Sequence, residues 1–149
     1  MCMNVLFLCH GNVNRSAAGH VIMEQKYPQF NVKSAGLKTK DGKITAKKMR
    51  DSLTERGYPT EGIRSSVCTQ ELMDWADVVF YMDNGNEKRL NEQFGLPSKC
   101  VRLSNFLLGI NKIPDPAFAK GTEMHHQVIT MIEKALETWT TSLSSNKHT

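Results

Sequence analysis

The sequence predicts an α/β fold in which a parallel β-sheet is covered by helices on both faces. Two observations lead to this prediction. Strand-like apolar runs alternate with segments of helical spacing along the chain, and the two clearest runs are continuously apolar, as in strands buried on both sides. The 149 residues are enough to bury a substantial core, and no repeat or linker divides them. We therefore expect a single domain over residues 1–149.

The first half of the chain contains two predicted strands and two predicted helices. The apolar run at residues 4–8 is too short for an ordinary helix and is expected to form a buried strand. A helix is expected from Arg15 until Tyr27-Pro28 stops it. A second strand is predicted at residues 30–35, and a helix at residues 45–56 that Gly57 closes.

The second half repeats the alternation. Residues 76–82 form the clearest later strand, residues 87–93 look helical, and a short strand is expected at residues 100–103. An amphipathic helix is predicted from about residue 124, followed by a frayed tail at residues 143–149. Four parallel strands result, and ligands of such sheets bind at the carboxyl ends of the strands.

The composition excludes several classes of protein. No C-x-x-C pair indicates a zinc cage or a small disulfide framework, and the start of the chain lacks the features of a secretory signal. No apolar stretch approaches membrane-spanning length. We expect a cytoplasmic protein with no membrane or nucleic-acid partner, no cofactor and no metal. The four cysteines are Cys2, Cys9, Cys68 and Cys100.

The formal charge of +4 is concentrated in one stretch. Residues 38–50 contain six basic side chains and one acidic side chain, whereas the remainder of the chain is nearly balanced. The positive field of this stretch can steer an anionic partner. The alternative is that these side chains form an ordinary solvated surface.

The segment between the first strand and the first helix has the composition of a phosphate-binding loop. A cysteine is followed by five residues, an arginine and a hydroxyl residue. Backbone N–H groups of such a loop, together with the positive end of the helix dipole, bind a tetrahedral anion without a metal, and the same field favours a thiolate. The segment is Cys9-His10-Gly11-Asn12-Val13-Asn14-Arg15-Ser16.

Individual residues of this loop suit phosphoryl transfer. Arg15 can present its planar fork to two phosphoryl oxygens, which lysine cannot do. Ser16 can donate a hydrogen bond to the cysteine sulfur, Gly11 permits tight curvature, and Asn12 can brace the loop through its amide. The alternative interpretation of Cys9 is a small buried apolar residue.

The loop resembles the N-terminal signature of the low-molecular-weight protein tyrosine phosphatases, a family to which arsenate reductases are related. Three further segments resemble family landmarks in the correct order: residues 34–36, residues 81–83 with Asn86, and Asp115-Pro116. The resemblance covers nearly the whole chain. It implies a flavodoxin-like domain with a four-stranded parallel sheet.

The resemblance also implies roles for individual residues. Cys9 would be the nucleophile that carries a cysteinyl-phosphate intermediate, Arg15 would hold the transferred phosphoryl group, and Asp115 would be the general acid. Asn12, Ser16 and Ser34 would support the loop. The implied phosphate-binding residues are His10, Gly11, Asn12, Val13, Asn14, Arg15 and Ser16.

The chain departs from the family pattern at several positions. Asn14 replaces a second loop cysteine that relatives often use for redox protection, and Ala117 replaces the usual aromatic residue after Asp-Pro. Residues 38–48 contain no aromatic residue where relatives place the opposite pocket wall, so Phe118 is expected to compensate. The resemblance implies that the lysine-rich stretch borders the pocket at this wall. Val13 lies at the position where apolar residues are typical of phosphotyrosine enzymes and threonine of phosphoarginine enzymes.

The sequence therefore predicts a phosphomonoester hydrolase, monomeric or weakly dimeric, that acts on phosphotyrosine proteins or small phosphomonoesters. One alternative is a thiol-dependent arsenate reductase that uses Cys68 or Cys100. Another is a phosphate-binding regulatory module with weak turnover. We expect the histidines at positions 20, 125 and 126 to lie on helix surfaces rather than to bind a metal.

Overall fold

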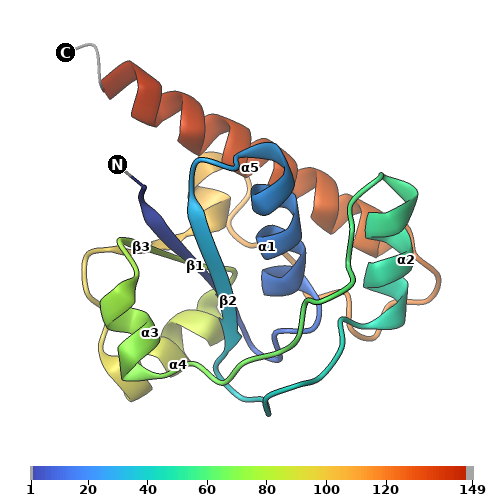
Figure 1. The fold of residues 1–149 in the computed structure, drawn as a ribbon, viewed down its shortest axis with the longest axis horizontal. Coiled ribbons are helices and arrows are strands. Elements are labelled where there is room, and N and C mark those ends of the chain that lie inside the picture. The colour runs from blue at the N-terminus through green and yellow to red at the C-terminus, as the bar shows by residue number, and fades with distance from the viewer. Residues whose placement is uncertain (1, 147–149) are drawn as a thin grey trace.

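A four-stranded parallel sheet forms the centre of the computed structural model, which describes the backbone of residues 2–146 and side chains as far as residue 144. The strands lie in the order β2-β1-β3-β4, and the first three are labelled in Figure 1. Strand β1 (Asn4–Cys9) pairs with β2 (Asn31–Gly36) on one side and with β3 (Val78–Tyr81) on the other. Strand β4 (Cys100–Arg102) completes the sheet beside β3.

Helices cover both faces of this sheet, as the alternating pattern predicts (Figure 1). One face carries α1 (Arg15–Lys26) and the long α5 (Glu123–Asn146), against which α2 (Lys47–Glu55) packs. The other face carries α3 (Gln70–Trp75) and α4 (Asn84–Phe94). The prediction of an α/β fold with four parallel strands is confirmed.

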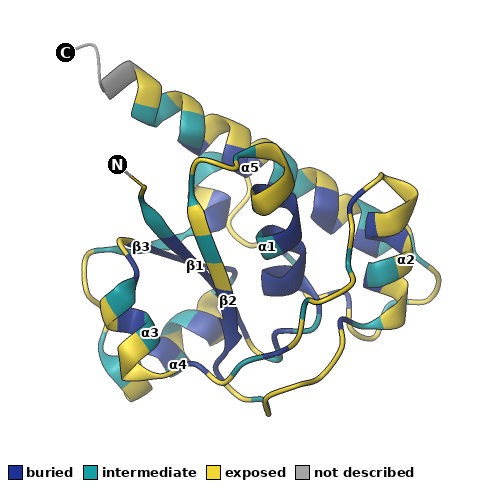
Figure 2. Ribbon diagram, in the orientation of Figure 1, coloured by how far each residue is buried: buried dark blue, intermediate teal, exposed yellow. Residues whose placement is uncertain are grey.

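The apolar side chains form one cluster on each face of the sheet. Side chains of β1 alternate between the two clusters, with Phe7 on the α1 and α5 side and Leu6 on the α3 and α4 side. Both side chains are fully buried, which explains why β1 is a continuous apolar run rather than an alternating one. Figure 2 shows this buried strip along β1 and on the inward faces of the helices.

Helix α3 was not predicted from the sequence. It spans only six residues, too few for an apolar periodicity to be recognised. Thr69 caps it, because its hydroxyl accepts a hydrogen bond from the backbone N–H of Leu72 at 3.2 Å.

Helix α4 begins earlier than the predicted residue 87. Asp83 is its N-cap, and the Asp83 Oδ1 atom accepts a hydrogen bond from the backbone N–H of Asn86 at 2.8 Å. This cap adds a turn to the helix at its start. It also fixes the position of Asp83 at the carboxyl end of β3.

The predicted frayed tail is partly wrong. Helix α5 continues to Asn146, and Leu143 packs against the larger apolar cluster. Residues 147–149 of the predicted tail lie outside the described residues. The apolar face of α5 therefore extends further than its clearest periodic positions indicate.

The chain order of the strands places two loops side by side. From β1 the chain proceeds through α1 to β2 on one side, and it later enters β3 on the other side of β1. The loops after β1 and β3 therefore diverge at the same edge of the sheet, which is where ligands of open parallel sheets bind. Cys9 ends β1 and Asp83 follows β3 at this edge.

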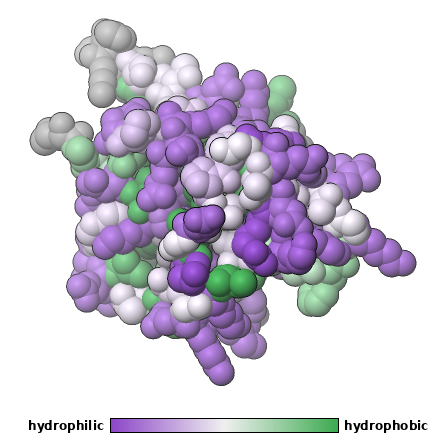
Figure 3. All heavy atoms as spheres, turned by 45° about the vertical axis from the view of Figure 1, so that its right-hand side comes forward, coloured by the Kyte–Doolittle hydropathy of each residue, from purple (hydrophilic) through white to green (hydrophobic). Residues whose placement is uncertain are grey.

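Among the described residues, none of the helices combines the length and the apolar character needed to cross a lipid bilayer. The face drawn in Figure 3 is mostly hydrophilic, with apolar atoms in scattered small patches.

Candidate active site

A cavity of about 540 Å³ opens at the carboxyl ends of β1 and β3. We call it the Cys9 pocket. Its lining includes Cys9, Arg15 and Asp115, together with four residues of the loop that joins β1 to α1. The three residues to which the sequence assigns the chemistry are thus brought together, although residue 115 is distant in the chain.

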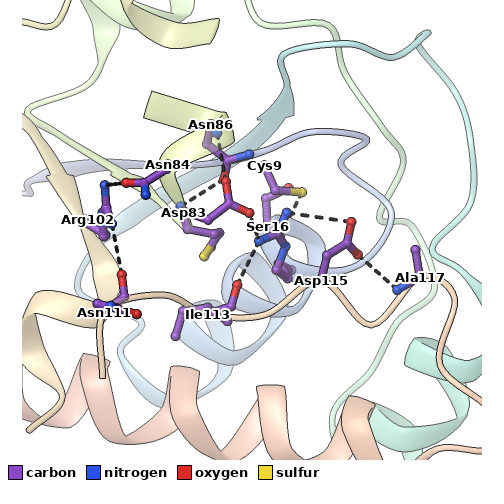
Figure 4. Close-up of polar contacts among 12 residues, drawn as sticks. Cys9, Ser16, Asp83, Asn84, Asn86, Arg102, Asn111, Ile113, Asp115 and Ala117 are labelled. Carbon is purple, nitrogen blue, oxygen red and sulfur yellow. Dashed lines mark hydrogen bonds and ion pairs between the residues drawn. The ribbon is translucent and has the colours of Figure 1, made fainter. Parts of the chain in front are cut away.

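Cys9 is a buried residue of the pocket lining, and its Sγ atom has two hydrogen-bonding neighbours. The Oγ atom of Ser16 lies 2.9 Å away, and the backbone N–H of Ser16 donates to Sγ at 3.4 Å. Figure 4 shows Cys9 beside Ser16. Both groups belong to the first turn of α1, whose dipole is positive at this end. The arrangement stabilises negative charge on the sulfur.

Asn12 holds the loop in its curved shape. Its φ angle is 57°, in the left-handed region that asparagine adopts more readily than most residues. The side chain is buried, and its Nδ2 atom donates to Ser16 Oγ at 2.7 Å. Its Oδ1 atom accepts from the backbone N–H of Ser66 at 2.9 Å. The amide therefore links the loop, the first turn of α1 and the segment before α3.

Gly36 supports the same loop from the end of β2. A Cβ atom at this position would lie 3.0 Å from the backbone oxygen of His10 and 3.2 Å from Asn12 Cβ. The absence of a side chain lets the loop pack directly on the strand end. This packing is the physical reason for a glycine after Ser34-Ala35.

The loop has unused hydrogen-bond donors. The backbone N–H groups of residues 11–14 donate to none of the described protein groups. Gly11, Val13 and Asn14 line the pocket, whereas the side chains of Asn12 and Ser16 lie behind it. Consecutive free N–H groups at a helix N-terminus form a concave site for a tetrahedral anion.

Arg15 is almost fully buried and is held by two acceptors. Its Nη1 atom lies 2.6 Å from Asp83 Oδ2 and donates to the backbone oxygen of Ile113 at 2.8 Å. Burial alone would raise the pKa of Asp83, but the hydrogen bond from Arg15 and the N–H of Asn86 hold this pKa below its usual value. The guanidinium is thereby fixed in orientation before any ligand binds.

Asp115 lies at the open side of the pocket. Its Oδ1 atom accepts from the backbone N–H of Ala117 at 3.0 Å, and its Oδ2 atom is 3.9 Å from Arg15 Nη2. The carboxyl group is about half exposed. It lines the same pocket as Cys9 and Arg15. Figure 4 shows Asp115 near Cys9 and Ser16.

The segment that carries Asp115 is anchored two residues earlier. The backbone N–H of Ile113 donates to the oxygen of Met82 at 2.9 Å, and the Ile113 side chain is buried. Arg102 of β4 donates to the backbone oxygen of Asn111 and to Asn84 Oδ1 of α4 (Figure 4). The general-acid candidate is thus attached to the ends of β3 and β4.

Ser34 has a different partner from the expected one. Its hydroxyl lies 2.8 Å from Nδ1 of His20, whose Nε2 is 3.3 Å from Glu24. Ser16 instead lies 3.5 Å from the backbone oxygen of Ala35. The prediction that His20 lies on a helix surface is wrong, because its ring extends from α1 toward β2 and is mostly buried there.

The other two histidines have different environments. His125 is buried on α5, and burial together with nearby positive charge from Lys48 lowers its pKa, so its prediction as a surface residue is also wrong. His126 is half-buried and lies 3.1 Å from Glu55. Among the described residues, no group of three or more His, Cys, Asp or Glu side chains could hold a metal ion.

Four residues of the pocket lining were not predicted as site residues from the sequence: Asp83, Gly85, Asn86 and Arg89. Arg89 of α4 lines the Cys9 pocket. The sequence spacing between Asp83 and Arg89 could not predict this position, because the direction of the Arg89 side chain depends on how α4 packs against the sheet. Phe118, which the sequence offered as a substitute aromatic wall, also lines the pocket and is 98% exposed.

Comparisons with known proteins agree with this geometry. Residues 4–149 match the family described as low molecular weight phosphotyrosine protein phosphatase. A protein-arginine-phosphatase from Geobacillus stearothermophilus is 33% identical over 119 residues, which cover 78% of this chain and 80% of that protein. The low molecular weight protein-tyrosine-phosphatase Wzb from Escherichia coli is 26% identical over 147 residues, which cover 99% of each chain.

Solved structures are similar over the same extent. The YwlE arginine phosphatase from Geobacillus stearothermophilus has a TM-score of 0.87 and 28% identity, covering 97% of this chain and 95% of its own. A protein tyrosine phosphatase from Entamoeba histolytica has a TM-score of 0.85 and 28% identity, covering 97% and 99%. Fold, pocket and relatives together define a phosphatase. The chain belongs to the low molecular weight phosphotyrosine protein phosphatase family.

We expect Asp83→Ala to lower the free energy of unfolding by about 2–4 kcal/mol, because it removes the α4 cap and leaves the buried guanidinium of Arg15 without its counter-ion. Chemical denaturation measures this. The matched control is Asp51→Ala, which removes an exposed ion pair with Lys47 and should cost less than about 1 kcal/mol.

The pH dependence of that stabilisation follows from the lowered pKa of Asp83. The contribution is fully present above the unfolded-state pKa of about 3.9 and is lost as the pH falls through the lower folded-state value. Equal effects of the two substitutions at neutral pH would contradict a structural role for the Asp83 to Arg15 pair.

Proposed function

We propose that this protein hydrolyses phosphomonoesters, with phosphotyrosine in proteins as the favoured substrate, through a cysteinyl-phosphate intermediate. One observation carries the proposal. Cys9 lines a pocket whose lining also contains a fixed guanidinium and a solvent-accessible carboxyl group. These are the nucleophile, the charge-stabilising group and the proton donor that the reaction requires.

In the first step the Cys9 thiolate attacks phosphorus. The S–P bond forms as the bond between phosphorus and the ester oxygen breaks, and the proton of Asp115 passes to the departing oxygen. The alcohol or phenol leaves, and the phosphoryl group remains on sulfur. The proton donor lies on the open side of the pocket, where a leaving group has a path to solvent.

In the second step water attacks the cysteinyl phosphate. Asp115, now a carboxylate, takes a proton from the water as the new P–O bond forms and the S–P bond breaks. Inorganic phosphate leaves, and the thiolate is restored. The hydroxyl of Ser16, 2.9 Å from Sγ, stabilises the departing thiolate and makes this step easier.

The charge of the transition state is met by groups that do not have to move. Arg15 is held by Asp83 and Ile113, so its remaining N–H groups are directed at the phosphoryl oxygens without reorganisation. The free N–H groups of the loop surround the same position. Preorganised donors of this kind supply the main electrostatic stabilisation in phosphoryl transfer.

The pocket favours an aryl phosphate over a phosphoguanidine. Phe118 offers a ring for stacking at the mouth, and Val13 adds methyl groups to the lining, which cannot accept a hydrogen bond from a guanidine. Arg15 and Arg89 add positive charge that suits a phosphate ester better than a second guanidino group. This supports phosphotyrosine despite the similarity to an arginine phosphatase.

The arsenate reductase alternative is not favoured by the other cysteines. Burial raises the pKa of Cys68 to about 12 and also raises the pKa of Cys100, so both are poor sources of thiolate. Both belong to the apolar cluster on the α3 and α4 face, and neither lines the Cys9 pocket. In the arsenate reductase alternative, a second cysteine thiol would have to reach the sulfur of Cys9, and neither Cys68 nor Cys100 is placed to do so.

Cys9→Ser is expected to lower kcat for p-nitrophenyl phosphate at least about a thousandfold while phosphate still protects the fold against heat, because a serine hydroxyl is a far weaker nucleophile in this site. Turnover with excess EDTA should equal turnover without it. The control is Cys68→Ser, which should retain activity. Substantial hydrolysis by Cys9→Ser would remove Cys9 from the mechanism.

Asp115→Asn is expected to slow the reaction of poor leaving groups about a hundredfold or more and that of p-nitrophenolate much less, since only a basic leaving oxygen needs a proton in the transition state. The measurement is kcat/KM across a series of aryl and alkyl phosphates. An equal loss throughout the series would assign proton transfer to another group.

A further inference from the structure

Arg89 approaches the mouth of the Cys9 pocket because of how α4 is docked. Gln93, one turn further along the same face of α4, donates from Nε2 to the backbone oxygen of Leu37 at 3.0 Å. The next residue, Lys38, donates its backbone N–H to the oxygen of His10 at 2.9 Å. These contacts bring α4, the end of β2 and the catalytic loop together on one side of the pocket.

The charge of Arg89 has no partner among the described side chains. Among the described side chains, none forms an ion pair or a hydrogen bond with its guanidinium. Arg102, which also contacts α4, is by contrast paired with Glu87 at 2.5 Å. Arg89 is half-buried in the pocket lining, and a guanidinium in such a position is well suited to an external carboxylate or phosphate.

The pKa of His10 reflects the position of Arg89 beside the pocket. Burial lowers the pKa of His10, and the positive charges of Arg89 and Lys38 lower it further. The lowered pKa favours the neutral imidazole, so the positive charge on this side of the pocket comes from Arg89 and Lys38. We call Arg89 and Lys38 the basic rim of the pocket.

The lysine-rich stretch at residues 38–50 was expected to border the pocket. Apart from Lys38, its side chains do not contribute to the basic rim. Lys47 pairs with Asp51, and Lys48 donates to the backbone oxygen of Ala119. Within residues 38–50, no side chain is part of the described pocket lining, and Lys38 acts on the pocket only through its field on His10. The dominant cation of the rim comes from α4.

We propose that Arg89 is a specificity residue that binds a second anionic group of the substrate, next to the phosphoryl group held by the loop. The inference rests on the proposed function, because it names the class of phosphomonoester that the same pocket takes. The shared chemistry is a carboxylate or phosphate close to the scissile ester. It can come from an acidic residue beside phosphotyrosine or from an anionic substituent on a small aryl phosphate.

The size of the effect follows from the partial exposure of Arg89. Ion pairs in contact with solvent are weak, so a second anionic group should raise kcat/KM about fivefold. The contact exists in the ground state as well as in the transition state, so the change should appear in KM rather than in kcat. Added salt should reduce it, since the screening length is about 10 Å at 0.1 M.

The test compares two pairs of substrates that differ in one charge. One pair is a phosphotyrosine peptide with glutamate or glutamine next to the phosphotyrosine, and the other is carboxyphenyl phosphate and carbamoylphenyl phosphate. Wild type should prefer the anionic member of at least one pair about fivefold. In Arg89→Gln the preference should fall to near unity through a higher KM, and Arg89→Lys should retain part of it.

The matched control is Lys88→Gln, which removes the same charge from the preceding residue of α4, an exposed residue outside the pocket lining. It should keep the wild-type preference. A preference seen only with the peptides would identify an acidic residue beside phosphotyrosine as the source of the anion. A preference seen in both pairs would show that Arg89 also selects small anionic aryl phosphates.

Two results would overturn the inference in distinguishable ways. Rapid hydrolysis of all four substrates with a charge preference that ignores Arg89→Gln, or that Lys88→Gln abolishes equally, would exclude Arg89 as a specificity residue and leave the proposed function intact. Failure of wild type to hydrolyse any of them would remove the proposed function and this inference together.

Discussion

The buried guanidinium of Arg15 is the constraint on which the site depends. A positive charge removed from water is costly unless opposite charge and hydrogen-bond acceptors meet it. Here Asp83 and the backbone oxygen of Ile113 meet it. Those two acceptors lie after β3 and just before Asp115, so satisfying one charge brings three distant parts of the chain into a fixed arrangement. The remaining face of the guanidinium is left to the ligand.

The position of each group follows from the sheet. Parallel strands that diverge from β1 leave a space between the loops after β1 and β3, and the first turn of α1 directs its N–H groups into that space. Asn12 then stabilises a backbone conformation that most residues avoid, using both ends of its amide. These contacts hold the loop in the curved shape that the proposed function requires.

Sequence reasoning predicts the elements that depend on local pattern. The apolar run before Cys9 and the helix-forming residues after Arg15 identify a strand, a loop and a helix, and the structure has all three. Sequence reasoning fails where tertiary packing determines the extent of an element or the position of a side chain. Helix α3 is too short for periodicity, and the early start of α4 depends on a cap that looks like part of a turn. Neither the contact of His20 with Ser34 nor the burial of His125 follows from spacing. Arg89 enters the pocket only because α4 docks on the end of β2.

The most direct test of the account is to stop the reaction during turnover and find the phosphoryl group. Wild-type enzyme and Asp115→Asn would be mixed with p-nitrophenyl phosphate, quenched in acid within milliseconds and digested for mass spectrometry. The account predicts a phosphoryl group on the peptide that contains Cys9, formed with a burst of p-nitrophenol and lost on chasing with water. A burst without phosphorylated Cys9, or phosphate found on another side chain, would contradict it.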